Sequence, residues 1–124
     1  MKILAGLVLF FGLAFAATAA PHSVTLSFTA SADDLGSTGT GYGYTAWRAS
    51  GTCPTTAPTT TAGFTALNTT PFLTTSYVDN TVTVGNFCYI ITFVSGSAQS
   101  LPSNAVGAAI LPQAPSGLKV VTVN

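Results

Sequence analysis

The sequence predicts an all-β protein, folded as an antiparallel sandwich or small barrel, and three observations support this. Short runs of alternating apolar and polar residues recur after Pro21, each bounded by turn-forming residues. Thr, Ser and Gly are abundant there, whereas strong helix formers are scarce. No stretch of that region has the apolar periodicity of a helix. Roughly 105 residues follow the apolar N-terminal segment, and this number is the usual size of one sandwich domain.

The runs can be followed in order along the chain. The first, His22–Ala30, places Val24, Leu26 and Phe28 on one face and Ser and Thr side chains on the other, as in a half-buried strand. Phe87–Val94 is the most apolar run after residue 20, which predicts the central strand of its sheet. The other strands are expected at Tyr42–Ser50, Phe64–Leu67 (near an edge), within Thr75–Val82 and at Asn104–Leu111, with a hairpin loop at Ser95–Ser100.

The first 19 residues have the pattern of a secretory signal peptide. Lys2 gives a positive start, Ile3–Ala16 an apolar core, and Ala17–Ala20 a small-residue end that predicts cleavage before Ala20. An uncleaved membrane anchor is the alternative, because Ile3–Ala20 is just long enough to span a bilayer. The small-residue end favours the signal peptide. We therefore expect a secreted, periplasmic or cell-surface domain over residues 20–111, followed by a tail at 112–124.

The chain after residue 20 is nearly uncharged. Arg48 and Lys119 are set against Asp33, Asp34 and Asp79, which leaves a formal charge of −1. This region has no basic patch, so nucleic acids and anionic membranes are poor candidates as partners.

Residues that could support catalysis or bind a metal are also scarce. His22 is the one histidine, and the sequence contains no Glu. Asp33 and Asp34 are adjacent in a Gly/Ser-rich loop, where a solvated turn is a commoner arrangement than an acid–base pair or a calcium site. Two cysteines beside a lone histidine do not make a zinc site. We therefore predict a protein that is not an enzyme and that uses neither cofactor nor metal.

Three stretches of the chain carry motifs of a known family. They read HSVTLSFTAS, then TGYGYTAWRAS, then FTALNTTPFLTTSYVDNTVTVGNFCYIITFVSGSAQSLPSNAV. In this order and spacing they resemble strands B, C and E to G of a bacterial fibronectin type III domain. The resemblance covers His22 to about Leu111 and implies an immunoglobulin-like antiparallel β-sandwich. Phe28 stands where the family usually has a core Trp, which exchanges one large apolar ring for another.

The resemblance to the family fails at two places: no strand precedes strand B, and an additional strand-like segment follows strand G. The family's sandwich begins with a strand A, but here the signal peptide leads almost directly into strand B at His22. The edge of strand B, with Val24, Leu26 and Phe28, is then expected to expose unpaired backbone groups that can template another strand. The last stretch, LPQAPSGLKVVTVN (Leu111–Asn124), is similar to the strand A that opens a following domain.

One hypothesis is that this tail fills the empty place in a neighbouring molecule, which the geometry allows without strain. In the family, strand G ends far from where strand A begins, so the tail would fill its own slot only by running back or by pairing in the wrong direction. Strand addition gains affinity from main-chain hydrogen bonds and specificity from alternate side chains. In the tail, one face of such a strand carries Leu118, Val120 and Thr122, and the other face carries Val121 and Val123. Repeated head to tail, such contacts give an open polymer. The alternatives are a frayed remnant, a linker, or a tail packed on its own sheet.

Cys53 and Cys88 are the only cysteines, and an even count in an exported protein favours a disulfide over two free thiols. The family topology supports this pairing. Strands C and F are antiparallel neighbours, so the chain just beyond strand C lies near the start of strand F. Such a bridge is worth about 2–4 kcal/mol when unstrained.

Two functional hypotheses follow from the sequence. The first is an exported structural or adhesive domain that acts through protein–protein contacts, with strand exchange as its means of self-association. The second is a carbohydrate-binding accessory module, with Trp47 and Tyr42 as an exposed aromatic platform for a polysaccharide. The alternative for these two side chains is packing over the sheet or in the core.

Overall fold

The computed structural model describes residues 21–124, which form seven strands and no helix. The predicted signal peptide, with its cut before Ala20, lies outside the described residues. Within residues 21–124 there is thus no helix with the length and apolar character needed to cross a membrane. The strands confirm the prediction of an all-β protein with antiparallel pairing.

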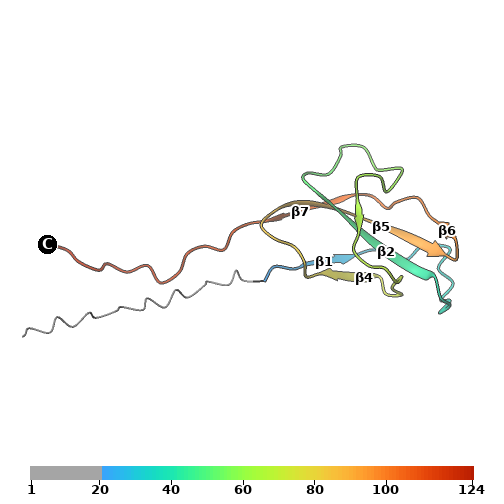
Figure 1. The fold of residues 1–124 in the computed structure, drawn as a ribbon, viewed down its shortest axis with the longest axis horizontal. Helices are drawn as coiled ribbons and strands as arrows, with labels where there is room; N and C mark the ends of the chain where they lie inside the picture. Colours follow the sequence, from blue (N-terminus) through green and yellow to red (C-terminus); the bar gives the residue numbers. More distant parts are fainter. Residues whose placement is uncertain (1–20) are drawn as a thin grey trace, which may run out of the picture.

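The strands form two sheets that face each other, an arrangement consistent with a β-sandwich (Figure 1). The smaller sheet pairs β1 (Val24–Ser27) with β4 (Ser76–Asp79). The larger sheet has the order β3-β2-β5-β6, and β7 also pairs with β5. Its members are β2 (Tyr42–Ser50), β3 (Thr65–Ala66), β5 (Gly85–Ser95), β6 (Ala98–Gln99) and β7 (Val106–Ile110).

Each run predicted to be a strand contains one in the structure. The first is shorter than predicted, because only Val24–Ser27 of the His22–Ala30 run has strand geometry. The prediction of a central strand at Phe87–Val94 is confirmed: β5 pairs with β2 along one edge and with β6 and β7 along the other. β3 pairs only with β2, as expected of an edge strand.

The core is made by the inward-facing side chains of both sheets. In β5 these are the odd-numbered aromatic and aliphatic residues, and in β1 they are the even-numbered ones, as the period of two requires. The buried members are Leu26, Tyr44, Ala46, Val82, Phe87, Tyr89, Ile91 and Phe93. Phe28 packs against them at the side: its ring meets that of Tyr44 edge to face with centroids 4.8 Å apart. Phe28 thus contributes an aromatic ring to this cluster.

A buried ion pair links the two sheets. The Asp79 carboxylate of β4 is 2% exposed and accepts hydrogen bonds from Arg48 Nη1 of β2 (2.7 Å) and from the Tyr89 hydroxyl of β5 (3.0 Å). Thr81 donates to it through its amide (2.9 Å) and its hydroxyl (2.6 Å). Burial of this carboxyl acts to raise its pKa, but the bonds from Thr81, Tyr89 and Arg48 outweigh that effect and hold the pKa below its usual value.

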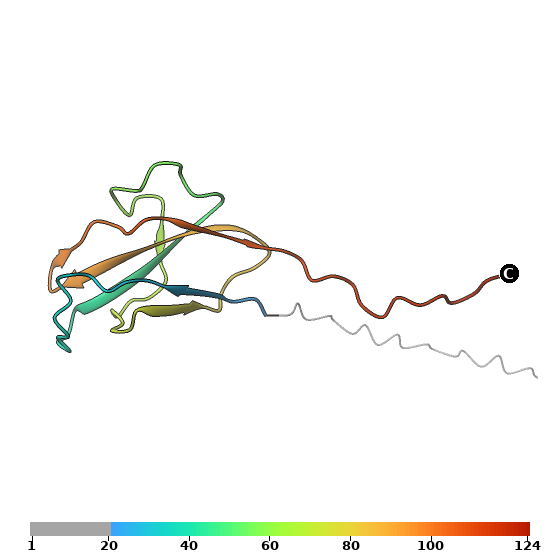
Figure 2. The ribbon, with the colours of Figure 1, turned by 180° about the vertical axis from the view of Figure 1, so that it is seen from behind.

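The predicted disulfide is confirmed. Cys53 lies just beyond β2 and is bonded to Cys88 of β5, with Cα atoms 5.0 Å apart. The bond ties the long loop after β2 to the central strand. Figures 1 and 2 both show this loop on the side of the larger sheet that faces away from β1 and β4. Because disulfides persist in oxidising compartments, the bond indicates an extracellular environment.

The two ends of the molecule carry different features. At the exit pole, β1 begins and β7 ends: Val24 pairs with Asp79, and Gly85 at the start of β5 pairs with Ile110. The opposite end, the loop pole, holds the Ser31–Gly41 loop and the β5–β6 turn. The C-terminal segment leaves the body at the exit pole, as both ribbon views show (Figure 2).

Candidate functional site

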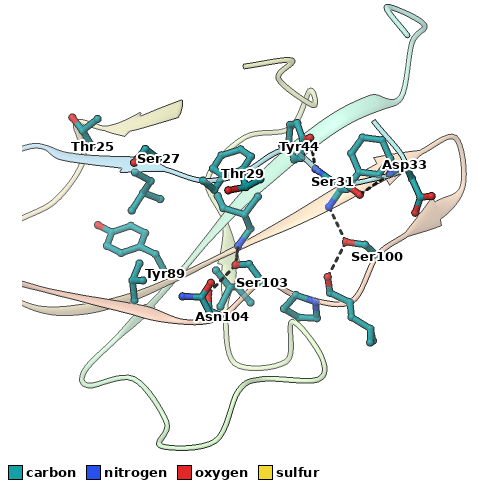
Figure 3. A pocket seen from close by; sticks show the side chains of 18 residues that line it. Thr25, Ser27, Thr29, Ser31, Asp33, Tyr44, Tyr89, Ser100, Ser103 and Asn104 are labelled. Carbon is teal, nitrogen blue, oxygen red and sulfur yellow. Dashed lines mark hydrogen bonds between the residues drawn. The ribbon is translucent and has the colours of Figure 1, made fainter. Parts of the chain in front are cut away.

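An open groove runs along one flank of the molecule, between β1 and the chain segment from Ser100 to Val106 (Figure 3). Its volume is about 990 Å³, which lies in the range of ligand-binding clefts. The residues along it include core side chains such as Leu26, Tyr89 and Ile91. The groove therefore reaches the hydrophobic core from the side: its interior is formed by these core side chains, and its rims carry Ser, Thr, Asn and Asp side chains.

One wall of the groove is the free edge of β1. The other edge of this strand is occupied, because β1 pairs with β4 and the Phe28 amide donates to the Thr75 carbonyl (3.1 Å). In an antiparallel pair the backbone groups of alternate residues point to the same side, so those of Thr25, Ser27 and Thr29 point away from β4. No described strand pairs with that side of β1. The wall is therefore a row of backbone donors and acceptors available to an added strand.

The other wall is held against β5 by serine hydroxyls. The amides of Ser100 and Ser103 donate to the carbonyls of Phe93 and Ile91, both at 2.8 Å. In return the Phe93 amide donates to Ser100 Oγ and the Ile91 amide to Ser103 Oγ, both at 2.9 Å. Between β6 and β7, side-chain oxygens thus replace the strand carbonyls that would otherwise satisfy β5. Sequence reasoning missed this wall, because a Ser-x-x-Ser spacing alone does not indicate such pairing.

The mouth of the groove at the loop pole is acidic. Asp33 lines the groove, and the adjacent Asp34 carboxylate accepts hydrogen bonds from the Tyr44 hydroxyl (2.7 Å) and the Gly36 amide (3.1 Å). Tyr42 adds its hydroxyl, 3.3 Å from Asp34 Oδ1. The bond from Tyr44, and then that from Gly36, lowers the pKa of Asp34 below its usual value. The mouth therefore carries negative charge at neutral pH, held in place by two tyrosines of β2.

The predicted strand-exchange segment lies far from the groove of its own molecule. Residues 111–124 form no strand and extend beyond the exit pole (Figure 1). Leu118 is 101% exposed, and Val120, Val121 and Val123 are also exposed. These four residues give the tail an apolar surface that nothing in the described chain covers. β1 thus has a free edge, but the prediction named the wrong residues for it: the free backbone groups belong to Thr25, Ser27 and Thr29, because those of Val24, Leu26 and Phe28 face β4. The tail is also unpaired.

The two residues predicted to form a sugar platform are not brought together. Tyr42 and Trp47 are five positions apart on β2, so the period of two puts them on opposite faces of the sheet. Tyr42 packs edge to face on Phe93, with centroids 5.0 Å apart, and Trp47 Nε1 donates to Thr92 Oγ1 on the other face (2.9 Å). They do not share one aromatic surface, and their odd spacing was the signal in the sequence that predicts this.

The chemistry of the groove suits an extended polypeptide. Within residues 21–124, no three His, Cys, Asp or Glu side chains gather in a way that could hold a metal ion. The described chain also has no buried side-chain nitrogen or oxygen without a hydrogen-bond partner, so the interior behind the groove is fully paired. The binding features that it does have are a strand edge and an apolar interior. These are the two requirements of strand addition.

Comparisons of this chain with family models, with curated proteins and with solved structures found no match.

Proposed function

We propose that this protein is a non-catalytic, exported structural or adhesive domain that self-associates by strand exchange. In this proposal the C-terminal segment of one molecule occupies the groove beside β1 of the next. The observation that carries it is the coexistence of an unpaired strand edge over an apolar groove with an unpaired apolar tail in one chain. Protein of the same kind is thus the partner, and neither nucleic acid nor membrane is involved.

The two parts match in length. Leu118–Val123 spans roughly 20 Å as a strand, and the stretch of β1 and its extension from Thr25 to Ser31 is of similar length. The preceding Pro112–Gly117 stretch provides about 20 Å of chain when extended, enough to cross between two bodies that touch at their poles. The donor segment therefore reaches a neighbour's groove without any change in the folded body.

The direction of the chain favours a neighbour over the molecule's own groove. The tail leaves at the exit pole, where β1 begins. To enter its own groove it has to reverse at once and run parallel to β1. A neighbour's tail that enters at the loop pole runs antiparallel to β1, which is the more stable pairing per residue. Assembly in trans then joins the exit pole of one molecule to the loop pole of the next, head to tail.

The resemblance to fibronectin type III domains gives this groove a simple interpretation. The topology supports an assignment of β1 and β4 to strands B and E of that fold. In the larger sheet, β3, β2 and β5 are assigned to strands C′, C and F, and β6 and β7 together to strand G. The groove then corresponds to the place of strand A. The exchanged tail acts as strand A of its neighbour.

Solution mass measurements test the proposal. The full chain, expressed with its native N-terminal segment and then purified, is compared by size-exclusion chromatography with light scattering to a variant that lacks residues 112–124. We expect masses above the monomer that grow with concentration for the full chain, and a monomer for the truncated variant. Circular dichroism of both checks that the fold is unchanged. A full chain that stays monomeric at high concentration contradicts the proposal.

A further inference from the structure

We infer that Lys119 selects both the face and the direction in which the tail enters a neighbour's groove. Leu118, Val120 and Thr122 point into the groove, and Lys119 lies at the acidic mouth formed by Asp33 and Asp34. The inference rests on the proposed strand exchange and specifies its geometry.

The face is decided by the cost of burying a charge. In a strand, Lys119, Val121 and Val123 point to one side, and Leu118, Val120 and Thr122 to the other. The groove's interior presents core side chains such as Leu26 and Ile91 and offers no unpaired buried carboxylate to an ammonium group. A lone charge in such surroundings is strongly unfavourable. The side with Lys119 therefore faces solvent.

The direction is decided by where the free negative charge lies. An antiparallel strand enters at the loop pole, so its first residues, Leu118 and Lys119, lie beside the end of β1 and the Asp33–Asp34 mouth. A parallel strand puts Lys119 at the exit pole instead. The carboxylate there is Asp79, which is 2% exposed and already paired with Arg48. Only the antiparallel direction gives Lys119 a free carboxylate.

Direction in turn determines the form of the assembly. A tail leaves its own molecule at the exit pole. When it enters the next molecule at the loop pole, the acceptor's own tail remains free at the far end, and the chain of molecules stays open. When it enters at the exit pole, two molecules can exchange tails reciprocally and close as a dimer. The acidic mouth thus favours an open polymer over a closed dimer.

The face is tested with two matched substitutions in the full chain, Val120→Asp and Val121→Asp. Both lie in the exposed tail, so neither disturbs the folded body. We expect Val120→Asp to weaken association by about a hundredfold or more, because it puts a carboxylate into the apolar groove. Val121→Asp is expected to change association by only a few-fold. Sedimentation velocity over a concentration series measures both.

Each outcome of this experiment distinguishes the inference from the proposed function. Loss of association in Val121→Asp, alone or together with Val120→Asp, overturns the assigned face and leaves strand exchange in place. Association that survives in both variants means that the tail is not the exchanged strand and overturns both ideas. A wild-type chain that stays monomeric overturns the proposed function and, with it, the inference.

The direction is tested by a charge swap. Lys119→Asp alone and Asp33→Lys alone are each expected to weaken association roughly three- to tenfold, and the double variant is expected to recover it. Asp33 suits this test because its side chain is exposed and forms no hydrogen bond. Masses of the wild-type chain that stop at a dimer, or a double variant no better than the single ones, overturn the antiparallel direction.

Discussion

The central strand β5 and the edge strand β1 differ in composition and in how completely they are paired. β5 has partners along both edges, seven consecutive buried residues and a disulfide to the loop after β2. β1 is paired along one edge, and only Leu26 of its four residues is buried. The continuous apolar run of β5 thus forms a closed, fully paired region, whereas the alternating run of β1 forms a half-buried strand with a free edge.

This difference indicates that stability and association are carried by separate parts of the molecule. The interactions that hold the body together gather around β5 and the Asp79 pair, and Tyr89 and Ile91 of β5 also line the groove from its core side. The groove and the tail can therefore change partners without unfolding the body. Such a separation predicts large losses of stability for changes in the closed region and small ones for changes in the open region.

The largest effect is expected for Asp79→Ala. This substitution leaves the buried Tyr89 hydroxyl and the more exposed Arg48 and Thr81 without their shared acceptor. Breaking a buried ion pair in this way costs about 3–5 kcal/mol of unfolding free energy. Urea denaturation followed by circular dichroism measures the loss. Asp33→Ala at the groove mouth is the matched control, with a change of about 0.5 kcal/mol or less expected. Equal effects of the two substitutions would contradict a division between closed and open regions.

Loss of the disulfide is expected to have the next largest effect. The bond joins residues 35 positions apart, and replacing both Cys53 and Cys88 by Ser lowers the unfolding free energy by about 2–4 kcal/mol. Wild-type protein unfolded in the presence of a reducing agent should match the double variant. Association through the tail should persist where the variant remains folded. Identical urea midpoints for the oxidised and reduced protein would show that the bond adds nothing to stability.

Acid is expected to destabilise the closed region through Asp79. Its pKa is lower in the folded protein than the usual value of 3.8, so the unfolded chain binds the proton more readily. The stability from this group is fully present above the unfolded pKa and is lost as the pH falls through the folded pKa. Asp34, whose pKa is also lowered, acts in the same direction. Unfolding free energies from neutral pH to about pH 3 should fall less steeply in Asp79→Asn than in the wild type. Parallel curves would assign the acid sensitivity to other groups.

The smallest effect is expected from removal of residues 112–124. Every residue of this segment is exposed and none belongs to a strand, so the deletion should change the unfolding free energy of the monomer by about 0.5 kcal/mol or less. Dilute protein, below the concentration at which association begins, is used for the urea titration. A clear loss of stability in the truncated monomer would mean that the tail packs on its own molecule.

Much of the fold could be predicted from local patterns, because strand signals depend on neighbouring residues. The alternation of Val24, Leu26 and Phe28 predicts a half-buried strand, and the apolar run at Phe87–Val94 predicts the central strand of its sheet. The disulfide was predicted from cysteine count and from the resemblance. Its confirmation depends on the antiparallel pairing of β2 with β5, which brings the two cysteines together.

The walls and the mouth of the groove could not be predicted in the same way, because they join residues that are distant in the sequence. The Ile91 amide finds its acceptor in Ser103, and Asp34 is held by Tyr44 across a loop. Each contact exists only because the sheets bring separate segments to the same flank. The aromatic platform was the opposite case: Tyr42 and Trp47 are close in sequence, yet the pleat of β2 separates them onto opposite faces.

The sequence by itself determined the strands, their inward faces and an apolar C-terminal segment, since these follow from residue order and the period of two. Only the tertiary structure decided that the free edge of β1 lies over an apolar groove, with carboxylates at the loop pole and the tail leaving from the exit pole. The physical reason is that pairing satisfies backbone groups one edge at a time. Which edge stays open depends on the whole topology, and no single segment of the chain specifies it.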